Sequence, residues 1–95
     1  MTAPPDVTDN REASRFELRA GDGLGVLDYT REGDRLYLTH TEVPPAVEGR
    51  GLGSALARAA LEQARVQGLH VVPWCPFVRA YIDRYPEYAA LVVPG

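Results

Sequence analysis

A chain of 95 residues is long enough for one small domain and too short for a separate substrate domain, so any chemistry must use a single cleft. The net charge of -3 argues against a nucleic-acid-binding surface. All ten basic residues are arginine, which excludes a lysine nucleophile or Schiff base. The one cysteine cannot form an internal disulfide, and no apolar run or signal core is long enough for a membrane, so we expect a cytoplasmic protein.

Three segments in the first half of the chain alternate apolar and polar residues, as half-buried strands do. They cover residues 15–20, 24–30 and 35–43, and turn signals at 21–23 and 31–34 separate them. We therefore expect an antiparallel meander of three strands. Residues 1–10 are polar and proline-bearing, and we expect them to be frayed.

The second half of the chain carries helix and strand signals in alternation. A helix is predicted over residues 52–67, a buried strand over 69–74, and a second helix from Pro76 to just before Pro86. The stripe expected to be buried on the first helix is Leu52, Ala55, Leu56, Ala59, Ala60, Gln63 and Val66, with Leu61 on the opposite face. The order β-β-β-α-β-α indicates one α/β domain with a mixed sheet, in which the last strand lies parallel to an earlier one.

The stretch VPPAVEGRGLGS, residues 43–54, joins the third strand to the first helix. Gly49, Gly51 and Gly53 would leave backbone N–H groups accessible at the positive end of the helix dipole, which suits a phosphate. A tight turn without a ligand is the alternative. The lysine-bearing nucleotide loop GxxxxGK[ST] is absent, and G-x-G-x-G differs from the dinucleotide pattern G-x-G-x-x-G, so nucleoside triphosphates and nicotinamide cofactors are disfavoured.

The segment EGRGLGSALARAAL resembles the acyl-CoA pyrophosphate loop and helix of the GNAT N-acetyltransferase superfamily, whose loop pattern is Q/R-x-x-G-x-G/A. Glu48 stands at the first position of that pattern, Gly51 at the fourth and Gly53 at the sixth. Together, HTEVPPAVEGRGLGSAL and VVPWCPFVRAYIDRYPEY resemble the small YjdJ-type branch of this superfamily. The resemblance extends over residues 24–92, with a tyrosine, Tyr85, where a histidine is expected before PEY.

This resemblance implies a minimal GNAT-like fold that binds acetyl-CoA. It also implies that the pantetheine arm of the coenzyme lies between two parallel strands that splay apart, here residues 35–43 and 70–74. We assign the loop and its neighbours to the cofactor: Val43, Glu48, Gly49, Arg50, Gly51, Leu52, Gly53 and Ser54. Arg50 can contact a phosphate or remain solvated.

Acyl transfer to an amine needs a proton acceptor, and the third strand supplies two candidates. His40 can take a proton from an ammonium group, as histidine does in many enzymes, or it can be a hydrogen-bonded histidine at the edge of the core. Glu42 lies two residues on, where it can act as the base, orient His40, pair with Arg50 or cap the loop. Strict alternation places both side chains on the face of Leu36 and Leu38.

Cys75 and Tyr81 are the remaining catalytic candidates. Cys75 precedes Pro76 at the expected N-terminus of the second helix, where the helix dipole favours a thiolate and nearby aromatic residues oppose it. It can take the acyl group covalently, lie beside the cofactor thioester, or be an inert core thiol. Tyr81 can protonate a departing thiolate, as a tyrosine does in many members of the resembled superfamily, or it can pack in the core.

The sequence therefore predicts a minimal GNAT-like domain over residues 1–95 that transfers an acetyl group from acetyl-CoA to an amine. The short chain leaves little to enclose an acceptor, which favours an open acceptor side or a pocket completed by a homodimer. An acyl-CoA-binding sensor and a protein-interaction module remain alternatives. His40, His70 and Cys75 lack a recognised metal-ligand spacing, so we expect no metal site.

Overall fold

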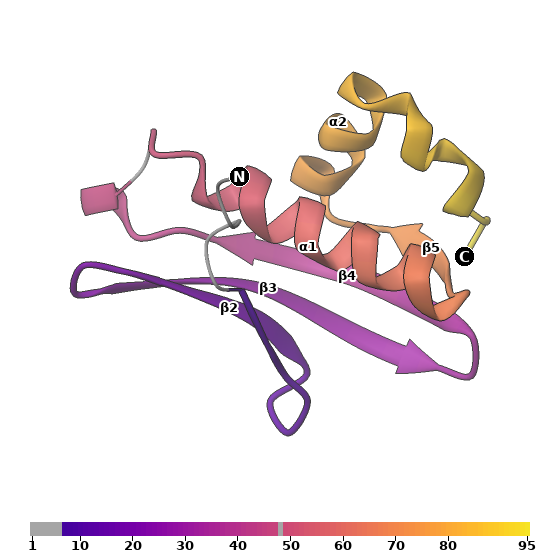
Figure 1. Cartoon of the computed structure of the whole chain (residues 1–95), viewed down its shortest axis with the longest axis horizontal. Coiled ribbons are helices and arrows are strands. Elements are labelled where there is room, and N and C mark those ends of the chain that lie inside the picture. The colour runs from indigo at the N-terminus through magenta and orange to yellow at the C-terminus, as the bar shows by residue number, and fades with distance from the viewer. Residues whose placement is uncertain (1–6, 48) are drawn as a thin grey trace.

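The computed structural model describes residues 7–47 and 49–95. The elements are β1 (Thr8–Asn10), β2 (Arg15–Ala20), β3 (Gly23–Glu32), β4 (Arg35–Glu42), the 3-10 helix η1 (Pro45–Val47), α1 (Leu52–Gln67), β5 (His70–Pro73), α2 (Pro76–Arg84) and the 3-10 helix η2 (Pro86–Leu91). From β2 onward they follow the predicted order of strands and α-helices, which confirms the mixed α/β class (Figure 1).

The described strands form one sheet in the order β1-β2-β3-β4-β5. The pairs β1–β2, β2–β3 and β3–β4 are antiparallel, and β5 lies parallel to β4. Gly21 and Gly33 form the two predicted hairpin turns with φ of 58° and 59°, values that glycine adopts without strain. Helix α1 lies between β4 and β5 in the chain, and the two strands are parallel neighbours in the sheet. This confirms the predicted crossover connection.

The expectation for residues 1–10 was wrong in part, because β1 pairs with β2. Residues 1–6 lie outside the described ranges. Asp9 ties this short strand to the rest of the fold: its carboxylate accepts a hydrogen bond from the Tyr29 hydroxyl at 2.6 Å and from the Gln63 amide at 2.9 Å. Strand pairing and polar side-chain bonds thus hold a polar segment in place, and hydrophobic periodicity does not detect either of them.

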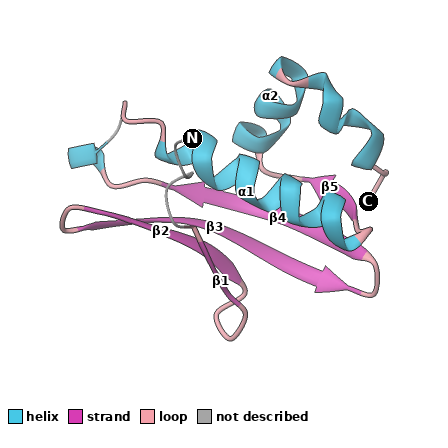
Figure 2. Cartoon of the chain, in the orientation of Figure 1, coloured by secondary structure: helices cyan, strands magenta, loops and turns pink. Residues whose placement is uncertain are grey.

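Both α-helices cover one face of the sheet, and the other face carries no helix among the described residues (Figure 2). The strands turn their large apolar side chains toward the helices, as period-two alternation requires. These side chains are Phe16, Leu18, Leu27, Leu36 and Leu38, and none is more than 4% exposed. No helix in the described part of the chain has the length and hydropathy to cross a membrane.

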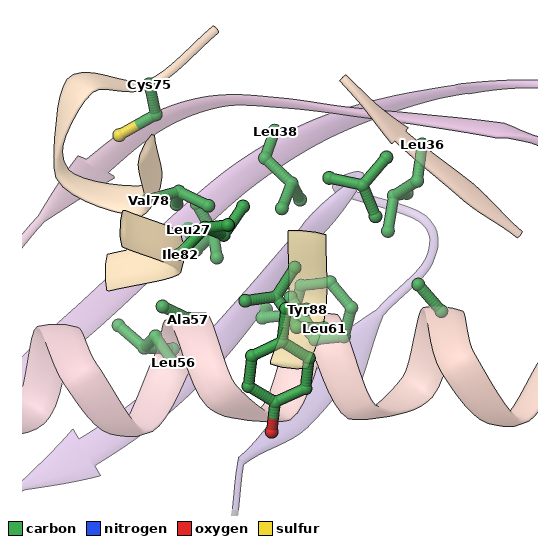
Figure 3. Close-up of a cluster of buried hydrophobic side chains, with 14 of the residues drawn as sticks. Leu27, Leu36, Leu38, Leu56, Ala57, Leu61, Cys75, Val78, Ile82 and Tyr88 are labelled. Atoms are coloured by element: carbon green, nitrogen blue, oxygen red, sulfur yellow. The ribbon is translucent and has the colours of Figure 1, made fainter. Parts of the chain in front are cut away.

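Helix α1 is buried over a wider arc than the sequence predicts. Its buried residues are Leu52, Leu56, Ala57, Ala60, Leu61 and Ala64. Leu61, expected on the outer face, is 0% exposed, and Val66, expected inside, is 75% exposed. The reason is that α1 packs on the sheet with one side and on α2 and η2 with another, so Leu61 and Ala57 lie within a shared cluster (Figure 3).

Tyr88 on η2 links the C-terminal segment to α1. Its side chain is buried, and its hydroxyl donates a hydrogen bond to a Glu62 carboxylate oxygen at 2.6 Å. Burial, reinforced by this bond, raises the pKa of Tyr88 to about 12. We expect Tyr88→Phe, which keeps the ring and removes the bond, to lower the free energy of unfolding by about 1–2 kcal/mol.

The Tyr88 contribution should also depend on pH. Because the folded pKa is raised above the ordinary value of 10.0, the stabilisation is complete below about pH 10 and is lost as the pH rises toward 12. Urea unfolding of wild type and Tyr88→Phe at about pH 8 and about pH 11 measures this, with the difference between the two proteins shrinking at the higher pH. A difference that is the same at both values would contradict the assignment.

Candidate active site at the glycine loop

Strand β4 carries a β-bulge at Thr39. His40 lies opposite Asp28 of β3, whereas the next residue of β3, Tyr29, lies opposite Leu38, so Thr39 is an extra residue in the pairing. The Thr39 hydroxyl donates a hydrogen bond to the Asp28 carbonyl oxygen at 3.1 Å and holds the bulge against β3. A bulge bends its strand and changes which face the following side chains occupy.

The bulge decides which side chains of β4 face the helices. Thr41 lies opposite the fully buried Leu27 and points to the helix side, so His40 and Glu42 point to the uncovered face of the sheet. The prediction that His40 and Glu42 share a face with the two leucines of this strand was therefore wrong. Side chains of β4 alternate between the two faces of the sheet only up to Thr39, and after this extra residue the faces are exchanged.

His40 and Glu42 form an exposed pair on the uncovered face. Their Nε2 and Oε1 atoms are 3.6 Å apart, and their side chains are 62% and 74% exposed. This exposure rules out a histidine satisfied at the edge of the core. No cluster of three or more His, Cys, Asp or Glu side chains that could hold a metal ion occurs in residues 7–47 and 49–95.

Strands β4 and β5 diverge at the bulge. Their pairing ends with Leu38 opposite Pro73, where β5 stops, while β4 continues to its own end. The Cys75 N–H donates one more bond to the Leu38 carbonyl oxygen at 2.8 Å. Beyond it, residues 39–42 have no strand partner on the β5 side within the described chain, and we call this gap the splay. Its backbone groups are available to a ligand, as the resemblance implies.

The glycine loop leads from this strand into α1 with a left-handed backbone. Gly49 has φ 87° and Gly51 has φ 77°, a region that other residues enter only with strain. A Cβ added to either glycine would meet nothing within 4 Å, so the space beside them is open. Gly51 caps α1 without a side-chain hydrogen bond. The first N–H groups of the helix therefore have no intrahelical acceptor and present the positive end of its dipole.

Gly53 is a glycine for a different reason. It lies in the first turn of α1, and a Cβ there would approach the Cζ atom of Phe77 to 2.8 Å. The prediction that all three glycines clear room for a phosphate therefore needs a correction at this position. Gly53 makes room for an aromatic side chain of α2.

A groove of about 430 Å³ lies between the end of β4, the loop and the starts of both helices. It is lined by Thr41, Val43, Gly49, Gly51, Leu52, Gly53, Ser54 and Phe77. Six of these belong to the eight residues that the sequence assigns to the cofactor. Arg50 is exposed, does not line the groove and makes no ion pair with Glu42 in the described chain. Glu48, which the sequence also assigns to the cofactor, lies outside the described residues.

Thr41 and Phe77 line the groove although neither was a sequence candidate. Thr41 could not be found by alternation, because its orientation depends on the bulge two residues earlier. Phe77 could not be found either, because its place in the groove depends on how α2 packs against Gly53 at the start of α1. The groove is therefore more apolar on its α2 side than the loop sequence alone suggests.

Cys75 lies at the N-terminus of α2, as predicted. It is the N-cap residue, Pro76 follows in the first turn, and Cys75 as a whole is 3% exposed. Its Sγ atom is 3.2 Å from the Thr41 hydroxyl, which places it directly behind a side chain of the groove. Figure 3 shows Cys75 at the margin of the buried cluster. The thiol therefore adjoins the groove without lining it.

Tyr81 lies in a cluster of tyrosines on α2 and η2, away from the groove. Its ring centroid is 4.6 Å from that of Tyr85 and 6.2 Å from that of Tyr88. Burial raises the pKa of Tyr81, so its hydroxyl stays protonated at neutral pH. It is one helical turn from Phe77 and does not line the groove, so the structure separates it from the other candidates.

The fold and sequence of the chain have clear relatives. Protein NATD1 from Gallus gallus is 34% identical over 86 residues, which cover 87% of this chain and 78% of that protein. Protein NATD1 from Homo sapiens is also 34% identical over 86 residues, covering 87% of this chain and 76% of that protein. The NMR solution structure of a GCN5-like protein from Staphylococcus aureus superposes with a TM-score of 0.72 at 18% identity, covering 99% of this chain and 93% of the other.

A family model agrees with these relatives. The model described as GCN5-related N-acetyl-transferase matches residues 15–91. This range includes the glycine loop, both α-helices and the strands β2 to β5, and it leaves out β1. The match supports the superfamily, whereas membership of the YjdJ-type branch stays a prediction. The chain belongs to the GCN5-related N-acetyltransferase family.

Proposed function

We propose that this chain binds acetyl-CoA in the glycine-loop groove and transfers the acetyl group to an amine. The observation that carries the proposal is the groove itself, which runs from the uncapped N-terminus of α1 to Thr41 at the splay. A ligand that fits both the loop end and the splay end of the groove has a diphosphate followed by a long arm that contains amide groups. Coenzyme A has this construction, and the thioester is at the far end of the chain.

The loop end of the groove fits the diphosphate. The N–H groups at the start of α1 are donors without helical acceptors, and open space lies beside Gly49 and Gly51. The described lining residues carry no acidic side chain that would repel an anion. At the other end, the free edge of residues 39–42 can pair with the amides of the pantetheine arm, as a strand would.

The two faces of β4 divide the work of acetyl transfer. The groove lies on the helix side, and His40 with Glu42 lies on the uncovered side, where an amine can approach without obstruction. His40 takes one proton from the ammonium group of the acceptor, so that a neutral amine attacks, and the Glu42 carboxylate orients and stabilises the resulting imidazolium. The amine and the acetyl group meet at the splay, where β4 and β5 no longer pair and the sheet is open between its two faces.

Cys75 is the proposed first acceptor of the acetyl group. Its sulfur attacks the thioester carbonyl, an S-acetyl bond forms as the bond to the coenzyme sulfur breaks, and the Cys75 proton passes to the departing thiolate. The neutral amine, which has given one proton to His40, then forms the C–N bond as the bond to Cys75 breaks, and its second proton passes to the Cys75 thiolate and restores the thiol. Thr41 holds the thiol in place, and Tyr81 keeps a packing role because it does not line the groove.

The covalent route makes a direct prediction. Incubation with acetyl-CoA and no amine should add one acetyl group to Cys75 and release one equivalent of coenzyme A, as measured by mass spectrometry of the intact chain and of its peptides. Cys75→Ser should bind acetyl-CoA with unchanged affinity and remain unmodified. Equal turnover by Cys75→Ser and wild type would show direct transfer to the amine instead.

A binding module without transferase activity is the second candidate. It is favoured by one observation: none of the residues that line the groove within the described chain has a titratable side chain. Such a module would hold acetyl-CoA without consuming it. Both candidates require coenzyme binding, and only the transferase requires the pair on the uncovered face.

Titration calorimetry of the folded wild type with acetyl-CoA and coenzyme A tests the proposal first. Binding of both, followed by release of coenzyme A in the presence of a panel of amines, supports a transferase. Binding with an intact thioester and an unmodified Cys75 in every mixture supports the binding module. Failure of the folded protein to bind either molecule overturns both, and leaves the glycine loop as a turn.

A further inference from the structure

Phe77 is an exposed aromatic residue in a position where the fold does not need one. It lies in the first turn of α2, it lines the glycine-loop groove, and its side chain is 42% exposed. Val78, the next residue, is 0% exposed and supplies the packing of this turn. The Phe77 ring therefore offers apolar surface to the groove and little to the core.

The contact with Gly53 fixes where this ring stands. The Cζ atom of Phe77 is 2.8 Å from the place of a Gly53 Cβ, and two further ring atoms are within 3.4 Å of it. The tip of the ring therefore touches the first turn of α1, beside the helical N–H groups. Val43 and Leu52 are the other large apolar residues that line the groove.

We infer that Phe77 recognises the pantoyl end of the pantetheine arm; this inference rests on the proposed function. In coenzyme A, a carbon bearing two methyl groups is separated from the diphosphate by a single CH₂. A diphosphate held at the start of α1 places those methyl groups next to the α1 end of the groove. Phe77, Val43 and Leu52 form the apolar surface at that point.

This assignment makes Phe77 a specificity-determining residue. The anion site alone accepts any diphosphate, since backbone N–H groups read charge and not the rest of the ligand. An aromatic ring beside the anion site increases the affinity for a ligand that continues with branched apolar carbon, and it does not increase the affinity for a ligand that ends at the phosphate. Phe77 thus separates coenzyme A from nucleotides that lack the pantetheine arm.

The test compares coenzyme A with 3′-phospho-ADP, which is coenzyme A without its pantetheine arm. Phe77→Ala should weaken coenzyme A binding about tenfold and change 3′-phospho-ADP binding by less than about twofold, as measured by calorimetry. Tyr85→Ala is the matched control. Tyr85 is a similarly exposed aromatic residue at the end of α2, 39% against 42%, and it does not line the groove, so both affinities should stay unchanged.

A double-mutant cycle with Gly53→Ala tests the contact itself. The added methyl group must push the ring away, and the exposed ring can yield, so the protein should remain folded and lose affinity for coenzyme A. In the Phe77→Ala background, Gly53→Ala should cause no further loss of affinity for coenzyme A. Thermal unfolding of each variant confirms that the fold is retained.

The outcomes separate this inference from the proposed function. Wild type that binds coenzyme A, with Phe77→Ala unchanged or equally weakened for both ligands, overturns the role of Phe77 alone. If the losses of coenzyme A affinity caused by Phe77→Ala and Gly53→Ala are fully additive, the contact between the two residues has no role. Gly53→Ala then acts at the anion site. No binding of coenzyme A by folded wild type overturns both the function and this inference.

Discussion

Gly51→Glu is expected to lower the affinity for coenzyme A about 100-fold or more. Gly51 caps α1, and a side chain there would enter open space beside the groove. A carboxylate in that position meets the diphosphate, and repulsion of about 3 kcal/mol at this range is enough for the expected loss. The left-handed φ of 77° adds strain of about 1–2 kcal/mol, which lowers stability as well.

Gly51→Gln is the matched control for this change. Glutamine has the same length and the same backbone strain as glutamate but no charge, so both variants should unfold at similar temperatures. Calorimetry should find a much smaller loss of coenzyme A affinity in Gly51→Gln. Equal losses in the two variants would mean that shape or strain, and not charge, controls the site, and would contradict an anion at the start of α1.

Deletion of Thr39 is expected to weaken coenzyme A binding about 100-fold while leaving the fold stable. Without the extra residue, β3 and β4 pair regularly, and the side chains of Leu38 and Thr41 keep their faces. The strand becomes shorter by about 3.3 Å, so Thr41 and Val43 move relative to the glycine loop. The bend that separates β4 from β5 is lost as well, and the splay narrows.

Thr39→Ala is the control for the deletion. It removes the hydrogen bond to the Asp28 carbonyl oxygen and keeps the extra residue. We expect a loss of stability of about 1 kcal/mol and little change in coenzyme A affinity. Urea unfolding and calorimetry measure both quantities for both variants. A deletion variant that binds like wild type would show that the bulge does not shape the groove.

The fold could be predicted from the sequence wherever local signals and packing agree. Alternation predicted β2, β3 and β4 to within two residues at each end, and Pro76 marked the start of α2. The face of α1 could not be predicted in the same way. Whether Leu61 is buried depends on where α2 and η2 pack, and these elements follow α1 in the chain.

The candidate site could be predicted in its backbone and not in its side chains. Glycines before a helix indicate an anion site regardless of the rest of the fold, and six assigned residues do line the groove. The faces of His40 and Glu42 depend on one extra residue in a strand, and no pattern in the sequence marks Thr39 as that residue. The role of Gly53 depends on Phe77, which is 24 positions away and on another helix.

The splay also leaves part of an internal strand of the sheet without a hydrogen-bonded neighbour on one side, among the residues that the structure describes. Along residues 39–42, β4 is an unprotected edge strand, although by topology it lies between two neighbours. Such an edge can pair with another extended chain and promote aggregation. Here the exposed stretch is short, bent by a bulge, bordered by the charged Glu42 and followed by Pro44 and Pro45, all of which oppose strand addition. The edge that we propose for the coenzyme is thus poorly suited to pair with a second copy of the chain.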